Sequence, residues 1–211
     1  MSTAASEHAP SRPQWALRHR RLIAVLGALL VAAALAACGG NSEVKETSGT
    51  YAGEGGAGAP YLSVGPLVYQ VQISRALNPY DVEDSAYLQG LSASQRELHP
   101  GEEFFAVFMQ VLNESNEDHH AASEITIHDI EGNVYHPIEP GQTNLFAYRP
   151  GAVVPAKNQL PIPSSVASSA PINGLMLLYK IKLESLEYRP LTVKIVSPTN
   201  PNDVASAELD S

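Results

Sequence analysis

The chain has 211 residues and a formal net charge of −9, with 44% hydrophobic and 17% charged residues, a composition typical of a globular protein. The charge is uneven, because residues 1–37 hold four arginines and one glutamate, whereas the rest of the chain holds 9 Lys/Arg against 21 Asp/Glu. This acidity argues against nucleic acid as a partner, since phosphate backbones would repel the domain. Cys38 is the single cysteine, so an internal disulfide is excluded.

The N-terminal segment predicts an export signal. A basic cluster at residues 18–21 precedes an uninterrupted apolar run of 16 residues at positions 22–37. A helix of that length measures about 24 Å, which is short for the roughly 30 Å hydrocarbon core of a bilayer. A basic flank and a short apolar run are typical of a cleaved signal peptide, here residues 1–37, whose positive end stays cytoplasmic. The adjacent Arg20 and Arg21 leave the Sec and twin-arginine export routes both open.

The apolar run ends in Leu35-Ala36-Ala37-Cys38, which resembles the lipobox of bacterial lipoproteins. The resemblance implies cleavage between Ala37 and Cys38, a diacylglyceryl group on the Cys38 sulfur, and acylation of the freed amine by a chain such as palmitate. Two or three acyl chains give firm anchoring, where one would be marginal. The expected location is therefore the extracytoplasmic side of a cell membrane. The alternative is that Cys38 merely ends a membrane helix or a plain signal peptide.

The segment after Cys38 predicts a tether. Seven of the 22 residues at positions 39–60 are glycine, and apolar side chains are few, so residues 38–60 are expected to form a lipidated, flexible linker. A random coil of that length reaches roughly 25 Å.

Residues 61–200 read as one β-rich domain. Alternating or wholly apolar runs predict about seven strands, at residues 67–74, 104–113, 124–130, 134–136, 153–160, 175–183 and 191–197. Residues 104–113 are apolar on both faces, which indicates a central strand covered on both sides. Residues 164–169 are compatible with one helical turn, and residues 201–211 are expected to be a disordered tail. The predicted fold class is all-β, an antiparallel β-sandwich with an immunoglobulin-like layout.

One family resemblance covers residues 67–197. An apolar strand leads into Asn116-Glu117, and a hairpin carries Asp129, Gly132 and Tyr135 in a D-x-x-G-x-x-Y pattern. A late strand at residues 175–183 and Arg189-Pro190-Leu191 complete the pattern. These features resemble the DUF4352 family of immunoglobulin-like domains found on bacterial lipoproteins. The resemblance implies extracytoplasmic placement and no established enzymatic activity; the proline-rich residues 137–171 depart from it.

Histidines supply a candidate metal site. Five of the seven lie within 38 residues, and the proposed ligands are His119, His120, His128 and His136. Imidazoles with neighbouring carboxylates suit Zn²⁺ or Cu²⁺, although the spacing matches no standard zinc motif. The alternative places His119 and His120 in a solvated loop and pairs His136 with Asp129 across two strands.

Two further groups of side chains each allow two interpretations. An acidic loop with Asp81, Glu83 and Asp84 has oxygens that could hold Ca²⁺, although a solvated loop explains it as well. The tyrosines of the domain suit either a contact surface or strand packing.

The sequence lacks the common catalytic signatures, such as a nucleophile elbow, a phosphate-binding loop or a dinucleotide fingerprint. We therefore expect a non-enzymatic protein without a cofactor, held in the membrane by lipid on Cys38 and binding another envelope protein. The alternatives are a metal-binding lipoprotein that uses the four histidines, and a hydrolase with scattered catalytic residues.

Overall fold

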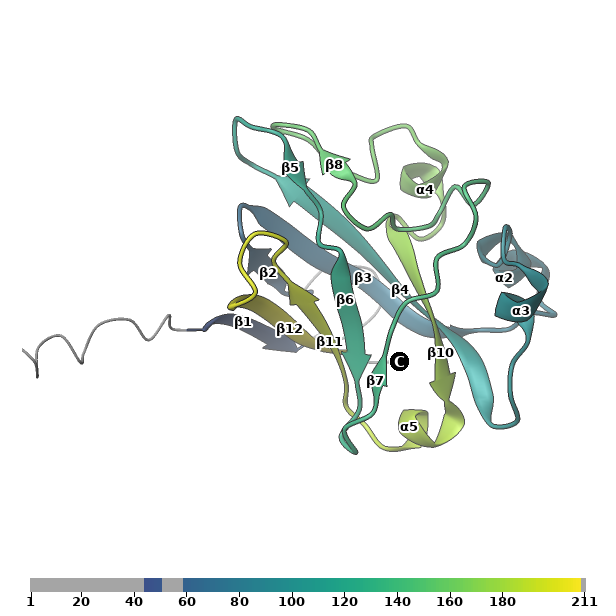
Figure 1. Cartoon of the computed structure of the whole chain (residues 1–211). Helices are drawn as coiled ribbons and strands as arrows, with labels where there is room; N and C mark the ends of the chain where they lie inside the picture. The colour runs from purple at the N-terminus through teal and green to yellow at the C-terminus, as the bar shows by residue number, and fades with distance from the viewer. Residues whose placement is uncertain (1–43, 51–58, 210–211) are drawn as a thin grey trace, which may run out of the picture. The chain divides into compact units, whose positions relative to one another are not determined.

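The computed structural model describes residues 44–50 and 59–209 (Figure 1). The predicted signal peptide, Ala37, Cys38 and much of the predicted tether lie outside these residues. No helix among the described residues is long and apolar enough to cross a membrane.

Two main sheets build the domain. The first sheet has the strand order β1-β12-β11-β6-β7. Its strands are β1 (Lys45–Thr50), β12 (Asp203–Leu209), β11 (Leu191–Val196), β6 (Glu124–His128) and β7 (Val134–Tyr135). The second sheet has the order β10-β4-β3-β2, and β9 adds to the end of β4. Its strands are β10 (Leu175–Lys182), β4 (Glu102–Asn113), β3 (Leu67–Leu77), β2 (Tyr61–Val64) and β9 (Gln159–Leu160). A small third sheet pairs β5 (His119–His120) with β8 (Val153–Val154).

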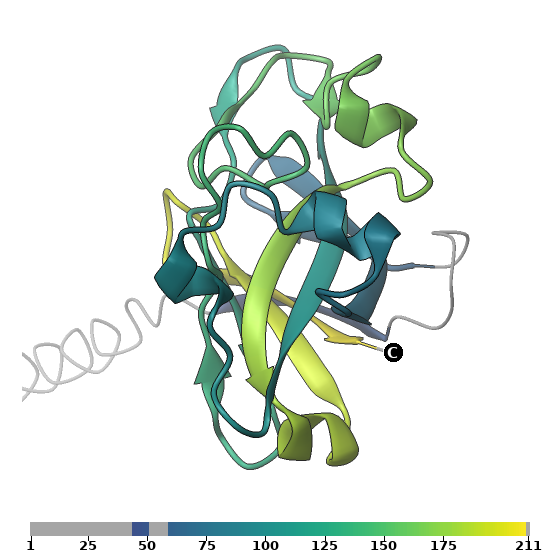
Figure 2. The same cartoon turned by 90° about the vertical axis from the view of Figure 1, so that its right-hand side faces the viewer.

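Four short helices lie in the connections. They are α2 (Val82–Tyr87), α3 (Ala93–Arg96), α4 (Val166–Ser169) and α5 (Leu183–Glu187). Side-chain oxygens of Asp81 and Ser92 accept backbone N–H groups at the starts of α2 and α3, which explains why these segments turn there. The expected helical turn at residues 164–169 is present as α4. Figure 2 shows α2 and α3 in front of the second sheet, on the side away from the first.

Strand β4 has apolar side chains on both faces, as predicted. Phe105, Val107 and Met109 point into the core between the two main sheets. Phe104 and Phe108 point to the opposite face and belong to a second cluster, which also holds buried residues of α2. The rings of Tyr87 and Phe108 meet edge to face at 4.9 Å between centroids. This second cluster explains why a continuous apolar strand does not expose half of its side chains.

The predicted all-β sandwich is therefore confirmed by the strand pairing. Almost all pairs are antiparallel, and the register of β4 with β10 and β3 runs along nearly its full length. The pair β1–β12 is parallel, which the sequence did not predict.

The C-terminal tail is the first correction. Residues 201–211 were expected to be disordered, but residues 203–209 form β12, which lies between β1 and β11. Ala205, Ala207 and Leu209 point into the core and are at most 1% exposed. Small side chains gave this segment a weak hydrophobic signal, yet alternation with Ser206 and Glu208 is regular.

The tether is the second correction, since residues 45–50 form β1. Glycine is required at position 49 of this segment, because a Cβ there would lie 2.5 Å from the Pro60 Cβ. Thr47 adds a hydrogen bond from its hydroxyl to the Ser63 carbonyl at 3.3 Å. These contacts attach β1 to the sandwich at a point where composition alone indicated a flexible linker.

The single edge strand expected at residues 153–160 is the third correction. This segment divides into β8 and β9, which pair with different partners. Between them, the Asn158 N–H donates to the Pro155 carbonyl, and Lys157 has a positive φ of 56°. The resulting turn separates the two short strands.

Candidate functional site

The predicted lipidation site lies close to the folded part in sequence. Ala37 and Cys38 are outside the described residues, and β1 begins at Lys45, so only residues 39–44 separate Cys38 from the sandwich. At this end, Lys45 Nζ lies 3.3 Å from Asp203 Oδ1, and the Gly65 N–H donates to Asp203 Oδ2 at 2.8 Å. Asp203 thus joins the start of β1, the start of β12 and the β2–β3 turn.

The four histidines do not form a metal site in the described part of the chain. Within residues 44–50 and 59–209, no group of three or more His, Cys, Asp or Glu side chains is arranged to hold a metal ion. His119 and His120 lie on β5, and His120 Nδ1 is 2.9 Å from the Gly151 carbonyl. His128 ends β6, and its Nε2 is 2.9 Å from Thr126 Oγ1. The described structure therefore does not gather the four proposed ligands into one group.

The electrostatics of the hairpin explain the protonation state of one of these histidines. Burial lowers the pKa of His128, and electrostatic interactions with Lys194 and His136 lower it further, against an opposing effect of Asp129. Neutral His128 is thus favoured near pH 7.

Asp129 is the most highly connected polar residue of this region. Its Oδ1 accepts the N–H groups of Glu131 and Asn133, at 3.1 and 2.8 Å. Its Oδ2 accepts the Asn133 amide and the Ser185 hydroxyl, both at 2.6 Å. Tyr135 Oη is 2.6 Å from Ser185 Oγ. Burial alone would raise the pKa of Asp129, but the hydrogen bonds from Ser185 and Asn133 lower it overall.

These contacts give a structural role to the D-x-x-G-x-x-Y pattern. Asp129 closes the hairpin turn, Gly132 takes a positive φ of 89°, and Tyr135 holds α5 through Ser185. We call Asp129, Tyr135 and Ser185 the hairpin clasp. Ser185 is 1% exposed, and its hydroxyl donates to the buried Asp129 carboxylate inside this clasp.

The acidic loop considered for Ca²⁺ is occupied by internal contacts. Asp81 Oδ1 caps α2 by accepting the Glu83 N–H at 2.8 Å. Asp84 is buried and forms a two-point ion pair with Arg75, while its Oδ2 also accepts the Asn78 N–H at 2.8 Å. Burial would raise the pKa of Asp84, but Arg75 and Asn78 lower it overall. These oxygens stabilise the α2 connection.

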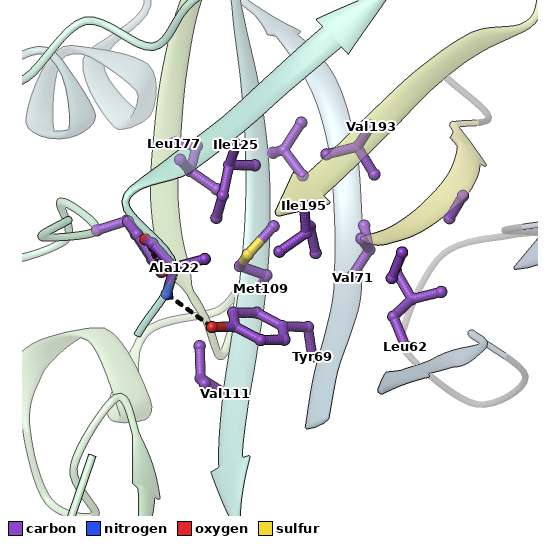
Figure 3. Close-up of a cluster of buried hydrophobic side chains, with 14 of the residues drawn as sticks. Leu62, Tyr69, Val71, Met109, Val111, Ala122, Ile125, Leu177, Val193 and Ile195 are labelled. Carbon is purple, nitrogen blue, oxygen red and sulfur yellow. Dashed lines mark hydrogen bonds between the residues drawn. The ribbon is translucent and has the colours of Figure 1, made fainter. Parts of the chain in front are cut away.

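Three buried tyrosines pack in the core and form hydrogen bonds with backbone groups. Tyr69 accepts the Ala122 N–H at 2.7 Å, and Figure 3 shows this bond crossing from β3 to the segment before β6. Tyr148 donates to the Ala122 carbonyl at 2.7 Å, and Tyr179 donates to the Ile125 carbonyl at 3.3 Å. Burial raises the pKa of all three phenols, so they stay neutral donors and acceptors. These tyrosines pack and satisfy backbone groups inside the sandwich.

One cavity lies beside the end of β4. It has a volume of about 670 Å³ and is lined by Leu112, Asn113, Glu114, Lys157, Asn158, Gln159 and Pro163. Lys157 Nζ donates to the Glu114 carbonyl at 2.6 Å, and the Asn113 amide donates to the carbonyls of Glu117 and Val154. These polar side chains hold the surrounding loops.

No protein-family model matches the chain, and no curated protein matches it. The resemblance to DUF4352 therefore stays a prediction.

Several solved structures align with the chain at low identity. One is ycdA from Bacillus subtilis, a protein assigned provisionally as a lipoprotein, with 9% identity, a TM-score of 0.42, and 72% of this chain and 39% of that chain covered. This chain thus spans well under half the length of that protein. Another is an uncharacterised β-sandwich protein from Clostridium difficile, with 11% identity, a TM-score of 0.43, and 81% and 99% covered. A third, functionally unknown protein from Listeria monocytogenes has 11% identity, a TM-score of 0.46, and 72% and 81% covered. The fold assignment rests on the strand pairing described above.

Proposed function

We propose that this chain is a lipid-anchored extracytoplasmic protein whose β-sandwich binds another protein of the cell envelope and performs no catalysis. The observation that carries the proposal is Leu35-Ala36-Ala37-Cys38, which ends a 16-residue apolar run behind a basic cluster and lies seven residues before β1. The family resemblance to DUF4352 lipoprotein domains agrees with this assignment.

The described surface favours binding over chemistry. Several of the polar residues proposed for metal binding, namely Asp81, Asp84, His120 and His128, form hydrogen bonds within the domain. The hairpin clasp, in contrast, is flanked by exposed apolar side chains. They are Ile130, Val134, Leu183 and Tyr188, between 46% and 60% exposed. Exposed apolar side chains are typical of protein contact surfaces when they lie together, so the surface beside the clasp is our candidate for such a contact.

The anchor is tested by replacing Cys38 with serine in the native host. We expect Cys38→Ser to move the protein from the membrane fraction or to leave an uncleaved precursor, because serine cannot receive the thioether-linked lipid. The matched control is Ser42→Ala, which changes a small side chain outside the Leu35–Cys38 pattern. A Cys38→Ser protein that is processed and membrane-bound like the wild type would reject the lipid anchor.

The binding surface is tested by photo-crosslinking on intact cells. A photoreactive residue is placed at Val134 beside the hairpin clasp, or at Val166 on α4, which has the same side chain and nearly the same exposure, 46% against 49%. We expect a discrete adduct from position 134 and none from position 166. Equal labelling at both positions, or none at either, would contradict a specific partner at the clasp.

A further inference from the structure

The end of the sandwich where the chain enters β1 has a defined set of loops. Lys45 lies against Asp203, and Asp203 Oδ2 accepts the Gly65 N–H, so the start of β1, the β2–β3 turn and the β11–β12 loop are adjacent. Gly65 also lies close to Ser197, whose side chain would be 3.2 Å from a Cβ at position 65. We call residues 44–45, 65–66 and 198–202 the entry end. Figure 1 shows β1 and the β11–β12 loop on the same side of the domain.

The pairing of β1 limits how far the entry end can lie from Cys38. Seven Cα–Cα steps connect Cys38 to Lys45, so their separation cannot exceed about 25 Å. If β1 were unpaired, the next described residue would be Ala59, and 21 steps would allow about 70 Å. A folded domain of this size is roughly 40 Å across. The paired β1 thus keeps Cys38 nearer to the entry end than one domain diameter, whereas an unpaired β1 would allow any face to approach the anchor.

The entry end is also poor in charge, although the domain is acidic. Residues 65–66 are Gly-Pro and residues 198–202 are Pro-Thr-Asn-Pro-Asn, without an ionisable side chain. Lys45, the one cation of these loops, is balanced by its ion pair with Asp203. Glu124 lines a pocket with Pro198 and Pro201 and so borders the entry end, whereas other acidic side chains, such as Asp81 and Glu83 at α2, lie elsewhere. Anionic headgroups would repel those regions more strongly than the neutral loops.

We propose that the entry end lies against the lipid headgroups and that the pairing of β1 with β12 holds it there. This inference rests on the proposed lipid anchor at Cys38. The antiparallel register then places the hairpin clasp away from the membrane, because β6 runs from Glu124, opposite Val196, to His128, opposite Thr192. The exposed apolar side chains beside the clasp are thereby presented to partners outside.

The orientation is tested on full-length protein, processed in cells, purified from membranes and reconstituted into vesicles with a quencher on a fraction of the lipid headgroups. Cys38 is the only natural cysteine, so a lipidated chain offers one free thiol when Thr199→Cys or Glu131→Cys is introduced. Both positions are exposed, one at the entry end and one in the hairpin. A fluorophore at 199 should be quenched at least about threefold more than one at 131, because a six-residue strand separates the two ends by about 20 Å.

The role of β1 is tested by a second pair of variants. Gly49→Val should displace β1, since a Cβ there would lie 2.5 Å from the Pro60 Cβ. The ratio of the quenching at position 199 to the quenching at position 131 should then fall toward one. The matched control is Ser48→Val on the same strand, at an exposed position, which should keep the wild-type ratio. Circular dichroism and thermal unfolding establish whether each variant is folded. The orientation itself is decided by the quenching ratio in the chain that carries only the labelled cysteine, so it is tested even if Gly49→Val does not fold.

The outcomes are distinct. Equal quenching at 199 and 131 in vesicle-bound protein would overturn the orientation while leaving the anchor intact. An unchanged ratio in folded Gly49→Val would reject the role of β1. Protein that does not float with the vesicles would reject the lipid anchor itself, and the orientation with it.

Discussion

At the scale of single residues, the hairpin clasp explains why a short turn has a fixed geometry. Asp129 is 8% exposed, yet it remains charged because four donors surround its carboxylate. The same residue connects β6 to α5 through Ser185, which lies 56 positions later. Local sequence pattern identifies the turn, whereas the partner on α5 becomes visible only in the folded chain.

We predict that Asp129→Asn destabilises the protein by about 2–3 kcal/mol at pH 7, because it replaces a charged acceptor of several buried hydrogen bonds. Urea unfolding measures the difference. The folded state lowers the pKa of Asp129. The carboxylate therefore adds to the free energy of unfolding above the pKa that Asp129 has in the unfolded chain, and this contribution is lost as the pH falls through the folded-state pKa. The difference in the free energy of unfolding between wild type and Asp129→Asn should therefore become smaller below about pH 4. A gap that stays constant down to pH 2 would contradict this account.

Tyr69 gives a second prediction at this scale. Tyr69→Phe should cost about 1–3 kcal/mol, because the buried Ala122 N–H would lose its acceptor. Tyr61→Phe is the control, since Tyr61 is 65% exposed and should tolerate the change. Equal thermal stability of the two variants would show that the buried bond contributes nothing.

At the scale of elements, β12 is central to the first sheet. Truncation after Asn202 removes the strand between β1 and β11 together with buried Ala205, Ala207 and Leu209. We expect that protein to be unfolded, as measured by circular dichroism and proteolysis. Truncation after Leu209 removes only residues 210–211 and should leave the unfolding temperature unchanged. A folded protein that ends at Asn202 would contradict the topology.

The elements that the sequence predicted well are those with large alternating side chains. The predicted strands at residues 67–74, 104–113, 175–183 and 191–197 correspond to β3, β4, β10 and β11. Strands β1 and β12 were missed because glycine, serine and alanine give little hydrophobic contrast, and their burial depends on close approach to distant residues. The short helices α2, α3 and α5 were missed because helices of four to six residues carry almost no periodicity.

At the scale of the whole molecule, some candidate sites can be identified from a local sequence pattern, whereas others are assembled only by folding. The lipobox pattern is local, so the sequence identifies Cys38 directly. The histidine cluster was inferred from proximity in the sequence, but strand pairing separates β5 from the β6–β7 hairpin. The apolar surface beside the hairpin clasp combines residues more than 50 positions apart, and no local pattern reveals it.

We predict that metal removal leaves the folded protein unchanged. Dialysis against a chelator should not shift the unfolding temperature, and titration with Zn²⁺ or Cu²⁺ should show no micromolar binding by the described domain, because His120 and His128 are engaged in other hydrogen bonds. If a micromolar site appears, His128→Ala and His136→Ala will show whether the hairpin histidines form it.

The central claim is that lipid on Cys38 holds the sandwich at the membrane. Mass spectrometry of the protein isolated from its native membrane tests this most directly. We expect a mature N-terminus at Cys38 that carries a diacylglyceryl group, with residues 1–37 removed. A chain that retains those residues, or a mature N-terminus with an unmodified Cys38 thiol, would contradict the account.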